Sequence, residues 1–94
     1  MPDEQRQYLE NLNGLISTGD DAREFMNTGL GRYLQQRAEE EIIDAFNQFK
    51  IIDVSEVDKV RTIQNKLLNA DRFLTWIQDC IVEGQEALKQ AEQL

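Results

Sequence analysis

Apolar residues recur every seven positions through the C-terminal part of the chain. One series consists of Val60, Leu67, Leu74, Ile81 and Leu88. A second series runs three residues behind it and consists of Ile63, Ala70, Ile77, Gly84 and Ala91. Because the two series occupy the a and d positions of successive heptads, they predict one helix of about 36 residues over 55–92. Ser55, which acidic residues follow, is its predicted N-cap.

A shorter apolar pattern precedes that helix. Steps of four and three connect Leu34, Ala38, Ile42, Ala45, Phe49 and Ile52. They predict a second amphipathic helix from Leu30 to Ile52. Only Asp53 and Val54 separate it from Ser55, and so short a connection predicts an antiparallel helical hairpin.

The residue pattern in the first third of the chain predicts shorter helices. One helix is expected over 3–17 and an interruption over 18–20, followed by a short helix that Asp20 or Asp21 caps. Glycines at positions 29 and 31 are expected to break or kink the chain before the hairpin.

The predicted fold is therefore an all-α helical bundle that forms a single domain over 1–94. Short N-terminal helices occupy 1–29, and the long antiparallel hairpin occupies 30–94. The d positions of the long helix are small in its C-terminal half, so a neighbouring helix is expected to approach it closely there.

The long helix is apolar around more than half of its circumference in its C-terminal half. Phe73, Trp76, Cys80 and Ala87 flank the heptad stripe there, so a second neighbour is expected. Trp76 lies at the far edge, where it either packs under the N-terminal helix or marks a partner interface; packing within the chain is the preferred interpretation. An N-terminal helix that crosses to a second chain, in a domain-swapped dimer, is a further hypothesis.

The negative net charge of the chain limits the classes of molecule that it is expected to bind. The chain has 18 acidic and 10 basic residues, with a net charge of -8. This charge repels phosphate backbones and anionic lipids, so direct binding of nucleic acid or of a membrane is not expected. The lone cysteine cannot form an intramolecular disulfide, and the sequence shows no transmembrane stretch or signal-peptide pattern, which predicts a protein of a reducing cytoplasm.

The residue types exclude much catalytic chemistry. The chain contains no histidine, which excludes Ser-His and Cys-His dyads, zincin sites and the His ligands of di-iron bundles. Cys80 is expected to be a packed structural residue.

The acids within 39–44 could hold a cation, but Arg37 lies four residues from Glu41 and consecutive acids point in different directions, so a solvated surface is preferred. The heptad series also offer no inward acids to a metal-dependent hydrolase. No catalytic, metal-binding or cofactor-binding residue is predicted, and the protein is not expected to be an enzyme.

Two stretches carry a resemblance to known proteins. They are Leu30–Glu41, which reads LGRYLQQRAEEE, and Phe73–Ala87, which reads FLTWIQDCIVEGQEA. They resemble small, acidic, helical proteins encoded among the head and tail genes of tailed bacteriophages. The resemblance implies a role in the virion or its assembly and a location in the host cytoplasm or the virion, and it carries over no catalytic residue.

The expected function is a non-enzymatic protein–protein interaction, in a phage structural or assembly component that self-associates as a homo-oligomer or docks on a larger partner. The candidate contact residues are Phe73, Trp76, Ile77, Cys80, Ile81 and Gly84. The alternative is an acidic inhibitor or nucleic-acid mimic that binds a basic cleft of a host protein. Arg32 and Arg37 interrupt the acidic surface that such a mimic would use.

Overall fold

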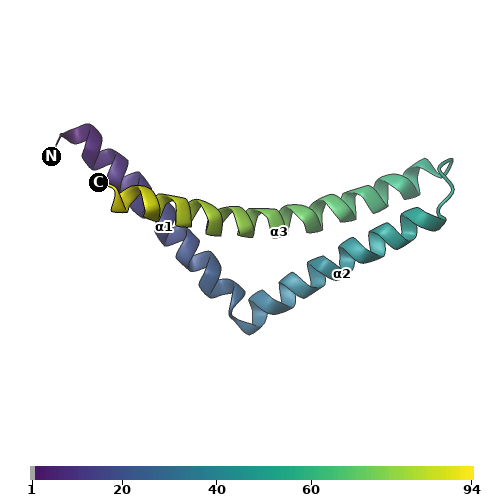
Figure 1. Ribbon diagram of the computed structural model, residues 1–94. Coiled ribbons are helices and arrows are strands. Elements are labelled where there is room, and N and C mark those ends of the chain that lie inside the picture. Colours follow the sequence, from purple (N-terminus) through teal and green to yellow (C-terminus); the bar gives the residue numbers. More distant parts are fainter. Residues whose placement is uncertain (1) are drawn as a thin grey trace.

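Three helices make up a triangle in the part of the chain that the structure describes. The computed structural model describes residues 2–94, which contain α1 (Asp3–Met26), α2 (Gly29–Ile51) and α3 (Val57–Glu92). α3 forms the longest side, α1 crosses it near its C-terminal end, and α2 runs back from the end of α1 toward the start of α3 (Figure 1). The predicted all-α fold, with a hairpin and one long C-terminal helix, is confirmed.

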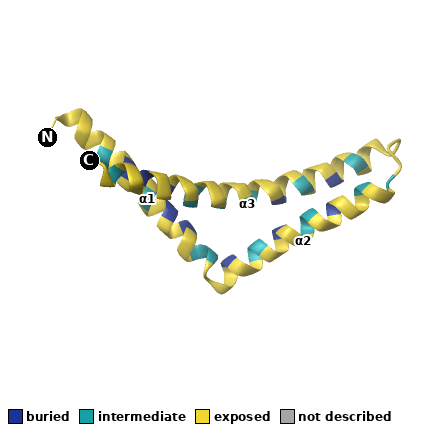
Figure 2. Ribbon diagram, viewed as in Figure 1, coloured by how far each residue is buried: buried dark blue, intermediate teal, exposed yellow. Residues whose placement is uncertain are grey.

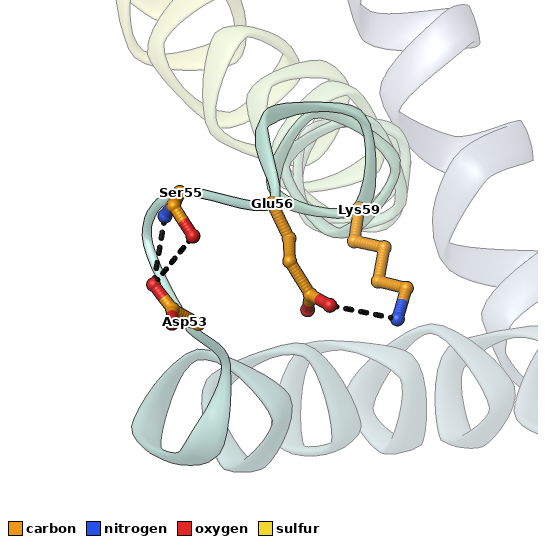
Figure 3. Close-up of polar contacts among 4 residues, drawn as sticks. All are labelled: Asp53, Ser55, Glu56 and Lys59. Carbon is orange, nitrogen blue, oxygen red and sulfur yellow. Dashed lines mark hydrogen bonds and ion pairs between the residues drawn. The ribbon is translucent and has the colours of Figure 1, made fainter.

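The turn between α2 and α3 differs from its prediction at one residue. α3 has the expected 36 residues, but it begins after Glu56, whose side chain makes no capping hydrogen bond. The predicted Ser55 cap is therefore wrong. The Ser55 backbone N–H and hydroxyl instead donate to Asp53 Oδ1 at 2.9 and 2.8 Å (Figure 3). Asp53 thus stabilises the turn itself, as aspartate does when it accepts from the residue two positions on.

α1 is one continuous helix of 24 residues, so the predicted interruption at 18–20 is wrong. Glycine inside a helix costs about 1 kcal/mol relative to alanine. Gly19 is nevertheless helical, because it is buried against α3. Tertiary packing of an amphipathic helix outweighs the preference of one residue. α1 packs on the α3 helix of its own chain and is the second neighbour that the sequence predicted for that helix.

The crossing of α1 and α3 brings two backbones into contact. A Cβ atom on Gly19 would lie 2.9 Å from the Cys80 carbonyl oxygen and 3.0 Å from the Gly84 Cα. Side chains larger than hydrogen would therefore push the helices apart. Farther along the crossing, the Tyr8 hydroxyl donates to Gln90 Oε1 at 2.8 Å.

A tight corner joins α1 to α2. The Thr28 hydroxyl donates to the Phe25 carbonyl oxygen at 2.6 Å and accepts from the Gly31 N–H at 2.9 Å, so Thr28 is the N-cap of α2. A Cβ atom on Gly31 would overlap the Phe25 carbonyl group. The chain turns at Asn27 and Thr28, and Gly29 and Gly31 belong to the first turn of α2 rather than to a break.

Alanines dominate the core. The buried apolar residues are Leu12, Ala22, Ala38, Ala45, Ile63, Ala70 and Ala87. They alternate along the helices with half-buried and exposed residues, and exposed surface predominates (Figure 2). No large side chain of residues 2–94 is completely buried. The Cα atoms span 63 × 29 × 16 Å, so the helices form one thin layer.

Candidate interaction surfaces

Trp76 projects from the C-terminal half of α3 and remains 66% exposed. The preferred interpretation, packing under the N-terminal helix, is therefore wrong. α1 covers the side of α3 that carries Gly84 and the buried Ala87, and it leaves Trp76 open. Large exposed aromatic residues on rigid elements often dominate the energy of protein interfaces. A partner contact at Trp76 stays a prediction.

A narrow apolar groove lies close to Trp76, between α2 and α3. It has a volume of about 180 Å³, and Leu34, Phe73 and two alanines line it. Leu30 is one turn before Leu34, and Trp76 is one turn after Phe73. Because α2 and α3 run antiparallel, Leu30 and Trp76 lie toward the same end of this groove, although neither lines it. We call Leu30, Leu34, Phe73 and Trp76 the Trp76 face.

The predicted contact residues do not share one surface. Phe73 and Trp76 belong to the Trp76 face, whereas Ile77 and Ile81 line a separate groove of about 490 Å³. This second groove lies between α2 and α3 where the two helices diverge, and Met26 at the end of α1 also lines it.

Two of the predicted contact residues already lie at the contact between α3 and α1 of the same chain. Cys80 is half-buried, and its carbonyl oxygen lies at the crossing with Gly19. Gly84 is buried at the same crossing, so its inclusion in a partner interface is wrong. The sequence pattern located the apolar arc of α3, but it could not show which part α1 would cover.

The first heptad series forms a half-covered stripe along α3. Four of its members are only half-buried, and Leu88 is 47% exposed. Three members of the second series, Ile63, Ala70 and Gly84, are buried. α1 and α2 thus cover mainly small residues of α3 and leave larger ones partly open. We name the Leu74 stripe after its middle member; it consists of Val60, Leu67, Leu74, Ile81 and Leu88.

Other exposed apolar residues lie outside the set of predicted contact residues. Ile43 and Phe46 are more than half exposed, and they follow Glu39 by four and seven residues. Helical spacing therefore places them on the side of α2 where Glu39 lines the larger groove. Ile51 and Val54 are even more exposed at the hairpin turn. The available signal was that these residues fall outside the apolar period of α2.

The acidic cluster of α2 is mixed with basic groups. Glu40, Glu41 and Asp44 line a polar groove of about 640 Å³, but Arg37 and Lys66 line it too. Arg37 Nε lies 3.6 Å from Glu41 Oε1. Over residues 2–94, no group of three or more His, Cys, Asp or Glu side chains is placed to hold a metal ion. These carboxylates therefore share one exposed surface with basic side chains.

Two exposed side chains have shifted pKa values. Arg37 Nη1 donates to the Tyr33 hydroxyl at 3.4 Å, and this bond is the main cause that raises the pKa of Arg37. The backbone N–H and the hydroxyl of Ser55 lower the pKa of Asp53. Local hydrogen bonds at the surface therefore explain both shifts.

The exposed surface is large for a chain of this mass. A compact monomer of 10.9 kDa is expected to expose about 5,600 Å². The chain exposes 7184 Å². Its radius of gyration is 18.9 Å, against about 12 Å for a compact chain of the same length. The surplus of about 1,600 Å² exceeds the roughly 800 Å² that one partner contributes to a standard interface.

Comparisons with protein-family models, with curated proteins and with solved structures found no match to this chain. Its described helices, over residues 2–94, include none long and apolar enough to cross a membrane.

Proposed function

We propose that the protein is a non-enzymatic interaction protein that binds another protein through the Trp76 face. One observation supports this function most directly: the 66% exposed Trp76 follows Phe73 by one helical turn, and Phe73 and Leu34 line an apolar groove. Arg37, Glu41 and other polar groups also line the groove. An apolar centre with polar groups at its edge is typical of protein interfaces.

The chemistry of the partner follows from this arrangement. The groove is narrow and runs between two antiparallel helices, so it fits a row of apolar side chains from one helix or strand of a larger protein. The resemblance to phage head and tail proteins adds the finer proposal that this larger protein is a virion component or an assembly intermediate. Co-sedimentation of the protein with phage particles or their precursors would test that finer proposal.

The experiment compares Trp76→Ala and Phe73→Ala with the control Thr75→Ala, which changes an exposed residue of α3 that lines the other groove. Each tagged variant is used to capture proteins from the source cells, and circular dichroism confirms that it is helical. We expect Trp76→Ala and Phe73→Ala to lose the captured partner and Thr75→Ala to retain it.

Fluorescence then locates the contact. Trp76 is the only tryptophan of the chain, so its emission reports on this face without a label. Titration with the purified partner should shift the emission to shorter wavelength, and Phe73→Ala should weaken binding at least tenfold. The proposal fails if both face variants keep their helical content and still capture the same partner.

The alternative function, an acidic inhibitor or nucleic-acid mimic, is not favoured. Such a protein needs a continuous negative surface to complement a basic cleft. Arg37 and Lys66 line the same groove as Glu40, Glu41 and Asp44.

A further inference from the structure

We propose that a second copy of this chain packs on the Leu74 stripe, so that two single layers of helices form a two-layer dimer. Helical spacing places Ile43 and Phe46 of α2 on the side of the layer where Glu39 shares a groove with Leu74 and Ile81 of the stripe. The stripe and the Trp76 face include different residues, so this inference goes beyond the proposed function and can hold when that function fails.

The layered shape is the first reason. Stable domains are built from two or more packed layers around one apolar core. This chain supplies one layer, 16 Å in its shortest dimension, and its buried apolar residues are five alanines, Leu12 and Ile63. A second layer would complete the core by covering the larger side chains that α1 and α2 leave half-exposed.

The length and period of the stripe are the second reason. Val60 and Leu88, the two ends of the stripe, are 28 positions apart, or about 42 Å along the helix. Residues that repeat every seven positions form a seam that drifts by about 20° per heptad, so it can face another long helix when the two helices coil gently around each other. α3 is itself such a helix, so two copies related by a two-fold axis present the same seam to each other.

The area is the third reason. The surplus exposed surface of about 1,600 Å² per chain lies in the range that one subunit buries in an obligate homodimer. Another copy is also present wherever the chain is made. Most soluble oligomers are symmetric assemblies of identical chains.

The first test measures mass by light scattering after size exclusion, over a roughly hundredfold range of concentration. We expect a species of about twice 10.9 kDa. We also expect the midpoint of thermal unfolding to rise with protein concentration, because folding and association are coupled. A monomer at every concentration, with a midpoint that does not change, would overturn the proposal.

A matched pair of variants locates the interface. Leu88 belongs to the stripe and Leu68 does not, yet both are leucines of α3 with exposures of 47% and 45%. Leu88→Glu should raise the dimer dissociation constant at least tenfold, whereas Leu68→Glu should leave it within about threefold of the wild type. If Leu88→Glu does not fold, Leu88→Ala gives the same comparison with Leu68→Ala. Equal effects at the two positions would overturn the proposal.

Trp76 separates this dimer from association through the other face. If copies meet at the Leu74 stripe, the Trp76 emission should keep the wavelength of an exposed indole as the dimer forms, and Trp76→Ala should leave the mass unchanged. A dimer that Trp76→Ala abolishes and Leu88→Glu leaves intact would instead place self-association on the Trp76 face and refute this inference.

Discussion

α3 packs in two different ways along its length. In the C-terminal half of α3, α1 crosses it so that Gly19 lies against Gly84, and the backbones of the two helices are in contact. In its N-terminal half, α2 lies alongside it with the buried Ala38 and Ala45, and grooves remain between the two helices. The first arrangement leaves no space for added atoms. The second leaves space that other side chains can fill.

The difference explains where the candidate surfaces lie. Close backbone contact hides the small residues at the crossing, so no partner can reach Gly84. The looser pair of α2 and α3 leaves Leu74 half-buried in a groove and Trp76 exposed. The part of the molecule that is most tightly packed is therefore distinct from the part suited to binding.

The largest effect is expected at the glycine crossing. Gly19→Ala and Gly84→Ala should each lower the free energy of unfolding by about 2 kcal/mol, because the added Cβ would meet backbone atoms that cannot rotate away. Urea unfolding followed by circular dichroism, at one fixed protein concentration, measures the change. Gly14→Ala in the same helix is the control, since a Cβ there meets nothing within 4 Å. It should raise stability by up to about 1 kcal/mol. Losses of equal size at Gly14 and Gly19 would show that the crossing is not the cause.

A smaller effect is expected at the corner that joins the two regions. Thr28→Val keeps the shape of the side chain but removes the hydroxyl that caps α2 and donates to the Phe25 carbonyl oxygen. The free energy of unfolding should fall by about 1 kcal/mol. Thr28→Ser keeps the hydroxyl and should retain most of the stability. If the two variants unfold at the same urea concentration, the cap does not stabilise the corner.

A larger side chain should destabilise the α2–α3 hairpin less than it destabilises the crossing of α1 and α3. Ala38 lines the groove of about 180 Å³, so the flexible side chain of Ala38→Met can extend into it. We expect the free energy of unfolding to stay within about 1 kcal/mol of the wild type, although more atoms are added than in Gly84→Ala. The same urea measurement decides the question. A loss larger than that of Gly84→Ala would contradict the contrast between the two regions.

The smallest effect concerns the pH dependence of the hairpin turn. The folded-state pKa of Asp53 lies below its ordinary value because Ser55 donates to the carboxylate. The ionised form is thus favoured by folding, so its contribution is present above the ordinary pKa and is lost as pH falls through the lowered pKa. Stability profiles between about pH 6 and 2 should show a slightly steeper acid loss for the wild type than for Asp53→Asn. Identical profiles would show that the turn does not respond to this carboxylate.

The fold was largely readable from apolar periodicity, because long helices carry many repeats of the pattern. The bounds of α2 and α3 were predicted to within two residues at each end. Gly19 misled the prediction, since its local preference suggested a break and only the distant Gly84 reveals its role in packing. The sequence around Ser55 was compatible both with an N-cap of α3 and with a turn residue. In the structure Ser55 donates hydrogen bonds to Asp53 and does not cap α3.

The candidate surfaces were less predictable for the same reason. The sequence identified the wide apolar arc that contains Phe73 and Trp76. Which part of that arc stays exposed depends on the angle at which α1 crosses α3, and this angle depends on contacts between residues about 65 positions apart, Gly19 and Gly84.

The closed triangle of helices has a mechanical consequence. Three struts of fixed length that are joined at three corners form a truss, whose angles cannot change unless a strut changes length or a joint slips. Helix length is set by residue number, at about 1.5 Å per residue. Adding one turn to α2 would therefore widen the angle at which α1 crosses α3 at Gly19 and Gly84. The overall shape of the molecule can thus be changed by altering the length of one helix.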